Sequence, residues 1–268
     1  MRTIGHVAVN VFKESVRDKV LYSIVAFAVL LISTSYLIGQ LTAGQDIKII
    51  KDLGLAAISI FGLLIAIFMG IGLVWKEVEK RSIYALLSKP VRREQFVLGK
   101  YCGLVLTLFV NVAVMTVAYY AVLAYIQYTS TPVDLGLAEA VPTDPWMLEA
   151  IVLIFVELML VTAIALFFST FSGPFLSAMM TAGLWVAGHF NDDLRNFGAI
   201  ISAPAIARFT RAVYYVIPNF AAFDVKNQVV HAQAVPLRYV GLTVVYGLVY
   251  VALVMAGAVT VFSRRDFK

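Results

Sequence analysis

Long apolar stretches, separated by short polar segments, dominate the pattern of this chain. A helix needs roughly 20 apolar residues to cross about 30 Å of hydrocarbon, and each uncharged run reaches that length. The uncharged runs cover residues 20–45, 53–75, 101–133, 158–191 and 239–263.

The fourth uncharged run is long enough to contain a turn. Residues 169–174 read Ser-Thr-Phe-Ser-Gly-Pro, a cluster of turn residues that divides the run between two helices. The pattern therefore predicts six transmembrane helices within one membrane domain, residues 1–268. Their expected ranges are 20–41, 53–75, 101–126, 147–168, 175–190 and 239–262.

The predicted fold is all-α. Backbone polar groups cannot stay unpaired in lipid, and the chain lacks the alternation of ten-residue barrel strands. The first run is too long for the apolar part of a signal peptide and lacks a convincing cleavage site, so we interpret it as a span.

Three further segments carry a local pattern. Apolar residues recur at helical spacing over 4–11, which predicts an amphipathic helix in the membrane interface, or else a short extension of the first span. Gly62, Ala66 and Gly70 form a small-residue stripe for close helix packing, either within the chain or across a dimer. Within the segment 191–236, a short helix is expected before Pro218 and a second after Asn219.

Composition agrees with a membrane protein. The chain has 268 residues, of which 61% are hydrophobic and 14% charged, and its mean hydropathy is +0.89. A soluble domain could not keep such a surface hydrated. The single cysteine, Cys102, excludes disulfides within the chain.

The distribution of charge predicts the orientation. With both termini in the cytoplasm, the inner segments hold 14 Lys/Arg against six acids, and the outer segments hold seven against nine. Lys and Arg accumulate on the cytoplasmic side of membrane proteins. The net charge of +5 is therefore a topological signal, and no nucleic-acid partner is needed to explain it.

The segment 76–100, between the second and third predicted spans, concentrates charge: it holds seven Lys/Arg, three Glu and Pro90. Its first half also contains Ile83, Leu86 and Leu87, which a loop that only sets topology does not need. Pro90 ends a helix that precedes it. We interpret the segment as a short amphipathic helix that binds a partner, although a solvated basic loop is the alternative.

Candidate chemistry is sparse. Glu157 falls midway along the fourth predicted span, where an ionised carboxylate is costly. It is either a transport-path, proton-relay or cation-binding acid, or a structural acid paired across a helix interface. His6, His189 and His231 show no zinc-ligand spacing, and we interpret their positions as chance.

Motifs for catalysis are missing from the sequence. No serine lies in a G-x-S-x-G turn with a histidine partner. Gly99-Lys100 has neither the preceding glycine nor the following Ser/Thr of a Walker A loop, so ATP is not expected to bind there.

Taken in order, these segments resemble the membrane subunit of an ABC-2 type transporter. The similarity covers nearly the whole chain, and its most specific part is E-x-x-K-R-S-I-Y-x-L-L-S-K-P-V at residues 77–91, followed by Gly99-Lys100. Pro218-Asn219-Phe220 and the ending F-S-R-R-D-F at 262–267 are also similar to family patterns, whereas Arg81-Ser82 replaces the frequent Gly-Thr.

The resemblance implies a role for each of these segments. It implies that 77–91 is a cytoplasmic coupling segment seated in a groove of a separate ATPase, as a homodimer or heterodimer that binds ATP and Mg. The expected coupling residues are Glu77, Lys80, Arg81, Ile83, Leu86, Leu87, Lys89 and Pro90. Pro218 and Asn219 are expected at an external gate, with Glu157 a possible residue of the translocation path.

We therefore expect a permease that is not itself an enzyme and has no cofactor of its own. It is expected in a bacterial or archaeal cytoplasmic membrane, paired with a second copy or a related permease. Because the path is mostly apolar, an amphipathic or lipid-like exported cargo is favoured. The alternatives are an ion-coupled secondary transporter working through Glu157, which lacks an obvious inverted repeat, and an intramembrane enzyme, which lacks a catalytic cluster.

Overall fold

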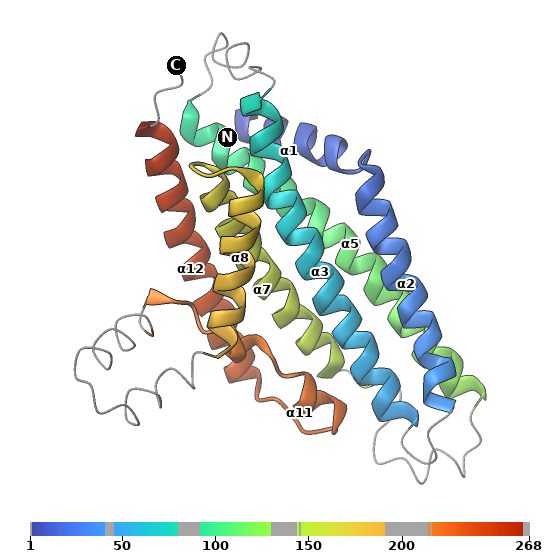
Figure 1. Cartoon of the computed structure of the whole chain (residues 1–268). Coiled ribbons are helices and arrows are strands. Elements are labelled where there is room, and N and C mark those ends of the chain that lie inside the picture. Colours follow the sequence, from blue (N-terminus) through green and yellow to red (C-terminus); the bar gives the residue numbers. More distant parts are fainter. Residues whose placement is uncertain are drawn as a thin grey trace.

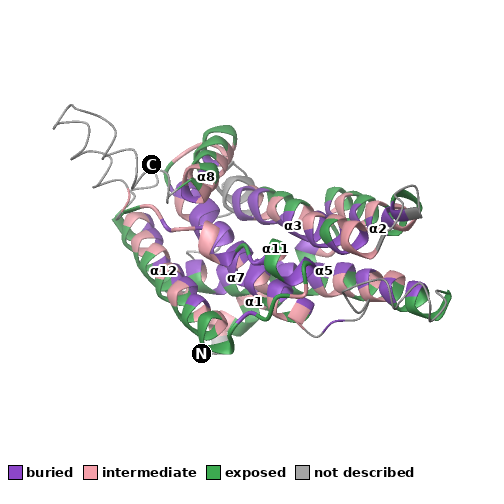
Figure 2. Ribbon diagram, turned by 90° about the horizontal axis from the view of Figure 1, so that it is seen from below, coloured by how far each residue is buried: buried purple, intermediate pink, exposed green. Residues whose placement is uncertain are grey.

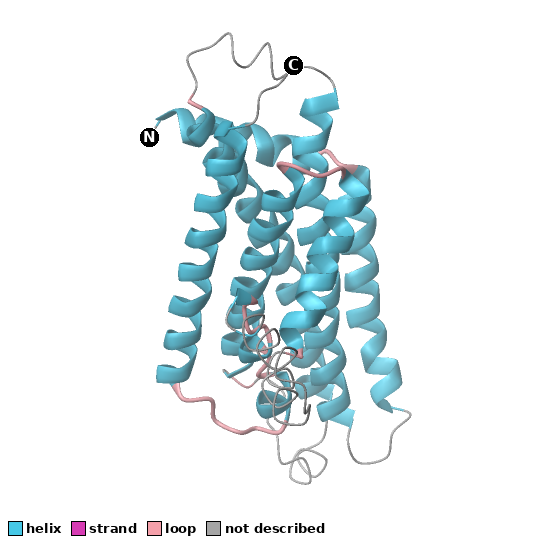
Figure 3. Ribbon diagram, turned by 60° about the vertical axis from the view of Figure 1, so that its left-hand side comes forward, coloured by secondary structure: helices cyan, strands magenta, loops and turns pink. Residues whose placement is uncertain are grey.

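The computed structural model describes residues 2–40, 46–79, 92–129, 144, 146–190, 214 and 216–264. These residues form a bundle of long helices, and no strand occurs among them, which confirms the all-α prediction (Figures 1 and 3). The elements are α1 (Arg2–Ser15), α2 (Lys19–Gln40), α3 (Asp46–Glu79), α5 (Arg93–Thr129), α7 (Trp146–Ser169), α8 (Pro174–His189), η1 (Ala221–Phe223), α11 (Lys226–Val230) and α12 (Leu237–Arg264).

Five of these helices, α2, α3, α5, α7 and α12, are long and apolar enough to cross a membrane. They correspond to five of the six predicted spans. The remaining predicted span, 175–190, forms α8, whose 16 residues extend only about 24 Å. That length is short of the hydrocarbon thickness of about 30 Å. The sixth span therefore stays a prediction.

Local sequence accounts for the helix starts. Asp18 accepts a hydrogen bond from the Val20 backbone N–H (3.0 Å) and so caps α2 just after α1 ends. Pro174 occupies the first turn of α8, where its missing N–H costs nothing. Pro236 directly precedes α12.

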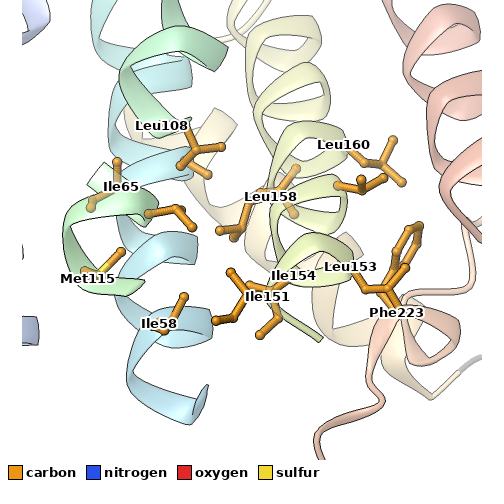
Figure 4. Packing of buried hydrophobic residues seen from close by; sticks show 14 of the residues in the cluster. Ile58, Ile65, Leu108, Met115, Ile151, Leu153, Ile154, Leu158, Leu160 and Phe223 are labelled. Atoms are coloured by element: carbon orange, nitrogen blue, oxygen red, sulfur yellow. The ribbon is translucent and has the colours of Figure 1, made fainter. Parts of the chain in front are cut away.

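Helix α7 is the centre of the bundle and lies against α3, α5, α8 and α12 (Figure 2). Figure 4 shows why: Ile58 and Ile65 of α3 and Leu108 and Met115 of α5 meet one side of α7, while Leu153, Leu160 and Phe223 gather on the other. Most of the apolar window of α7 is buried, whereas α2 and α12 leave apolar side chains such as Phe27 and Leu253 exposed. Those outer faces suit contact with lipid.

The small-residue stripe on α3 packs within the chain. A Cβ added to Gly62 would meet the Leu158 side chain, and one added to Gly70 would lie 2.6 Å from the Ala165 Cβ. Ala66, between them, is buried. Of the two alternatives for this stripe, the structure therefore shows the contact with α7 of the same chain.

A second glycine contact holds α1. A Cβ at Gly99 would lie 2.7 Å from the Val7 Cβ, and one at Gly103 would lie 2.7 Å from the Ala8 carbonyl oxygen. The apolar face predicted for α1 thus lies on the first turns of α5. Val11 is buried there, while His6 and Lys13 stay exposed.

The two ends of the bundle are tied by different groups. At the α1 end, the Arg93 guanidinium donates to the Ser263 carbonyl (2.9 Å) and Phe96 stacks on Phe262. At the opposite end, which α11 covers, the Tyr119 hydroxyl donates to the Lys51 carbonyl (3.2 Å). The starts of α1, α2 and α5 and the end of α12 therefore share one side of the molecule (Figure 3).

The glycine contact between α3 and α7 gives a first prediction. Gly70→Ala should lower the stability of the purified chain by about 1–3 kcal/mol, because the added methyl overpacks against Ala165. Gly72→Ala is the matched control, since no atom lies within 4 Å of a Cβ there. Thermal unfolding in detergent should separate the two variants; equal melting temperatures would contradict this packing account.

Candidate functional site

The site centres on Glu157, in the middle of α7. At this position the backbone N–H groups are used within the helix and cannot bind the carboxylate. The side chain is 3% exposed. Its Oε1 accepts a hydrogen bond of 2.7 Å from the indole Nε1–H of Trp185 on α8. A buried carboxylate needs such a donor, because leaving it unpaired in an apolar interior is costly.

His189 lies one turn beyond Trp185 and completes the group. Its Nε2 is 3.8 Å from Glu157 Oε1, and its Nδ1 is 3.2 Å from the Trp185 carbonyl oxygen. If Nδ1 donates to that carbonyl, Nε2 carries a proton and forms an ion pair with Glu157 only when the ring is doubly protonated. The pair can therefore hold one proton between two helices.

The turn between α7 and α8 brings these residues together. The turn occupies residues 170–173, and the two helices run antiparallel on either side of it. Residues about equally far from the turn lie side by side, which puts Trp185 level with Glu157. The missing zinc-ligand spacing of His189 says nothing about this contact, which the structure shows at 3.8 Å from Glu157. Counting outward from the turn is the signal that could have found Trp185 and His189.

Residues 217–225 lie against the end of α8 and cover the group formed by Glu157, Trp185 and His189. The Phe220 backbone N–H donates to the Gly188 carbonyl (3.0 Å), and the Phe220 ring stacks on His189 with 9° between the planes. A Cβ on Gly188 would clash with the Phe220 ring and lie 2.6 Å from the Pro218 carbonyl oxygen. Only glycine permits this approach at the end of α8.

Helix α12 fixes the same segment from the other side. The Tyr246 hydroxyl accepts a hydrogen bond of 2.8 Å from the Asn219 backbone N–H. The Phe223 ring lies 6.1 Å from that of Tyr246, and the Tyr239 hydroxyl donates to the Ala222 carbonyl (2.8 Å). Aromatic rings thus connect α8, the 217–225 segment and α12 without interruption.

Asp224 of this segment forms an ion pair of 3.5 Å with Lys226, which directly follows the segment. Their sequence neighbours Phe223 and Val225 are buried. Within the described ranges there is no cluster of three His, Cys, Asp or Glu residues able to hold a metal ion. The arrangement consists of a hydrogen-bonded acid, one histidine and backbone hydrogen bonds. Such groups can bind a ligand or hold the helices in one conformation.

The other predicted site residues are placed only in part. Pro218 and Asn219 lie in the covering segment, in contact with α8 and α12 as described. Glu77 belongs to the last turns of α3. The remaining coupling residues lie outside the described residues: Lys80, Arg81, Ile83, Leu86, Leu87, Lys89 and Pro90.

Five apolar helices of spanning length define an integral, multi-pass protein of the cell membrane. Over residues 6–267 the chain matches the model of the family described as ABC-2 family transporter protein, and it belongs to that family. It is therefore a permease component of an ABC transporter, and membership implies partnership with an ABC ATPase. No curated protein matches the chain significantly.

The Glu157 pairing gives the second prediction. Trp185→Phe should destabilise the protein by about 1–3 kcal/mol, because the buried carboxylate loses its donor. Trp146→Phe is the control, since residue 146 begins α7, far along the helix from Glu157. Glu157→Gln keeps an acceptor oxygen and should lose less than Trp185→Phe.

Thermal unfolding of the three variants in one detergent gives the comparison. Equal melting temperatures for Trp185→Phe and Trp146→Phe would contradict a stabilising hydrogen bond. Transport by Glu157→Gln at the normal rate would exclude a proton relay and leave Glu157 with the structural role.

Proposed function

We propose that the chain is the membrane subunit of an exporter for an amphipathic or lipid-like cargo, driven by a separate ATPase that docks on residues 77–91. ATP and Mg would be bound by that ATPase, and this chain would contribute no chemistry. The observation that carries the proposal is the family match over 6–267, which includes the coupling segment.

Helix lengths on both sides of the coupling segment support this assignment. The 34 residues of α3 and the 37 residues of α5 extend about 51 Å and 56 Å, well beyond the hydrocarbon layer of about 30 Å. Both helices continue toward the segment from the membrane. A push on 77–91 would therefore act on two continuous helices rather than on flexible linkers.

Contacts along α3 provide a route into the bundle. Gly62 and Gly70 bring α3 against Leu158, which directly follows Glu157 in α7, and against Ala165, about two turns farther along. A displacement of α3 along or around its axis cannot leave α7 unmoved, because close-packed surfaces transmit small shifts. We propose that motion of the ATPase reaches the Glu157 group by this path.

The segment 217–225 is then proposed as the external gate. It covers the outer end of α8 and is held by contacts from two helices, through Phe220 to α8 and Asn219 to α12. Relative motion of α8 and α12 would break one set of these contacts. Such a change would open or close the path while the long helices keep their packing.

The proposed orientation places the α1 end in the cytoplasm, with α8 as the sixth membrane element and its outer end completed by the gate segment. The excess of Lys and Arg on that side supports it. A second permease, identical or related, would complete the path. Family membership does not favour the ion-coupled alternative centred on Glu157.

The preference for an apolar cargo has a structural argument. Midway along the described long helices, Glu157 is the one ionisable acidic or basic side chain. It already accepts a hydrogen bond from Trp185. Buried Lys51 and Lys100 lie near helix ends. A strongly charged cargo would find few partners along such a path, whereas an acyl chain would need none.

The third prediction concerns docking. Leu86→Glu, or the charge reversal Glu77→Lys, should reduce co-purification of the ATPase at least several-fold without changing membrane insertion. A charge placed in the apolar face of a docked helix must be desolvated or expelled, which weakens the interface. Glu94→Lys is the matched control, because it reverses a charge at an exposed position of α5 outside residues 77–91.

Quantitative pull-down from membranes through a tagged permease measures this effect. Unchanged recovery of the ATPase in both variants would refute the coupling assignment. Transport by the chain alone in vesicles, without any ATPase, would refute the proposed function as a whole.

The fourth prediction concerns the gate. Tyr246→Phe removes the acceptor for the Asn219 N–H, a loss of about 1–3 kcal/mol when this partly buried donor is left unpaired. Transport should change by about tenfold or more while ATPase co-purification stays normal. Tyr125→Phe, at an exposed position of α5, is the control. Equal transport rates for the two variants would contradict a gate at this segment.

A further inference from the structure

A cavity of about 60 Å³ lies at the α1 end of the bundle, between the α1–α2 turn and α3. Glu14 and Ser15 line it from the end of α1, Asp18 from the turn, Val20 and Ile24 from α2, and Phe68 from α3. It is separate from the Glu157 group, which lies midway along α7. Glu14 and Asp18 form a charged edge of the cavity, and Val20, Ile24 and Phe68 form an apolar wall.

The charged edge has the opposite sign to its surroundings. Glu14 and Asp18 both line the cavity, whereas the segments that the sequence assigns to this side hold 14 Lys/Arg against six acids. Asp18 also caps α2 through the Val20 N–H, which fixes its carboxylate at the turn. Two carboxylates on one small cavity favour a cation.

Ser15 provides an independent observation. Its side chain is 5% exposed, and its buried Oγ makes no hydrogen bond to any described residue. Buried hydroxyl groups are ordinarily paired, because an unmade hydrogen bond is costly. The cavity that Ser15 lines is where a ligand could supply that partner.

The apolar wall continues to the outside of the bundle. Val20 and Phe68 line the cavity and are each 58% exposed, on helices whose outer faces are apolar. A ligand with a cationic head at Glu14 and Asp18 would thus have its apolar part against lipid-facing side chains. That is the chemistry of a membrane amphiphile.

The size of the cavity and its hydrogen-bonding groups limit which cationic head groups can bind. A cavity needs about 10–15 Å³ of such space to hold one water molecule, so this one has room for a small polar head group. A primary ammonium with its methylene fits this space and has three N–H donors for Ser15 and the two acids. A choline head group has three methyl groups and no N–H donor.

We propose that this cavity binds the primary ammonium head group of a phosphatidylethanolamine-type lipid, with its acyl chains along α2 and α3. Placing that lipid in the cytoplasmic leaflet rests on the orientation given under the proposed function. The binding itself does not, because it concerns only the residues of the cavity.

Native mass spectrometry of the full-length chain tests the proposal, with phosphatidylethanolamine and phosphatidylcholine of identical acyl chains as probes. The wild-type chain should bind phosphatidylethanolamine about tenfold more tightly, which is the effect of one charge-assisted hydrogen bond. Free ethanolamine at the same concentration should not displace the lipid. Equal binding of the two lipids, or displacement by ethanolamine, would overturn the lipid assignment.

Variants locate the binding. Glu14→Gln with Asp18→Asn should abolish the preference, and Asn keeps the capping oxygen that α2 needs. Ser15→Leu should also abolish it, by filling the cavity with both carboxylates intact. Glu94→Gln, an exposed acid on α5, is the control and should retain the preference.

An unchanged preference in either cavity variant would refute the site. Circular dichroism and the melting temperature of each variant show whether it folds, and the two cavity variants alter the protein in different ways. Nucleotide and ATPase are absent from the measurement, so its failure would leave the proposed transport function standing.

Discussion

Every backbone N–H and C=O that enters the hydrocarbon layer must be paired within the protein, and this constraint explains the least regular part of the structure. Helix α8 ends after 16 residues, which leaves its last carbonyl groups without partners in the helix. The N–H of Phe220 reaches one of them, at Gly188. The folded segment 217–225 thus completes the end of α8 by supplying a backbone donor to it.

Helix α7 shows how one element can serve packing and function together. It carries Glu157, yet nearly all of its other contacts are apolar and come from four neighbouring helices. The surrounding close packing holds the carboxylate at hydrogen-bond distance from Trp185.

Much of the fold could be predicted from the sequence, because apolar length and turn residues act locally. The five long helices and the turn at 170–173 follow from runs of uncharged residues and from Gly173-Pro174. Glu157 could be found for the same reason, as an acid in an apolar run. Its partners could not, because Trp185 and His189 become neighbours only when α7 and α8 pack antiparallel.

The small residues were only half predictable. The stripe of Gly62, Ala66 and Gly70 predicts a close helix contact, but not which helix makes it, since small residues carry no information about the partner. Gly188 belongs to no small-residue stripe or turn motif in the sequence. It is needed because the Phe220 ring and the Pro218 carbonyl approach the backbone there, a contact between residues far apart in sequence.

The seating of α1 on α5 has a mechanical consequence. Gly99 and Gly103 let the two helices meet at backbone distance, so a tilt of α5 must carry α1 with it. Helix α1 passes through a tight turn into α2, which packs against α3 and α5 and turns much of its apolar surface outward. Movement at the base of α5 would therefore reach α2 by two routes, through α1 and through the direct contact between α2 and α5.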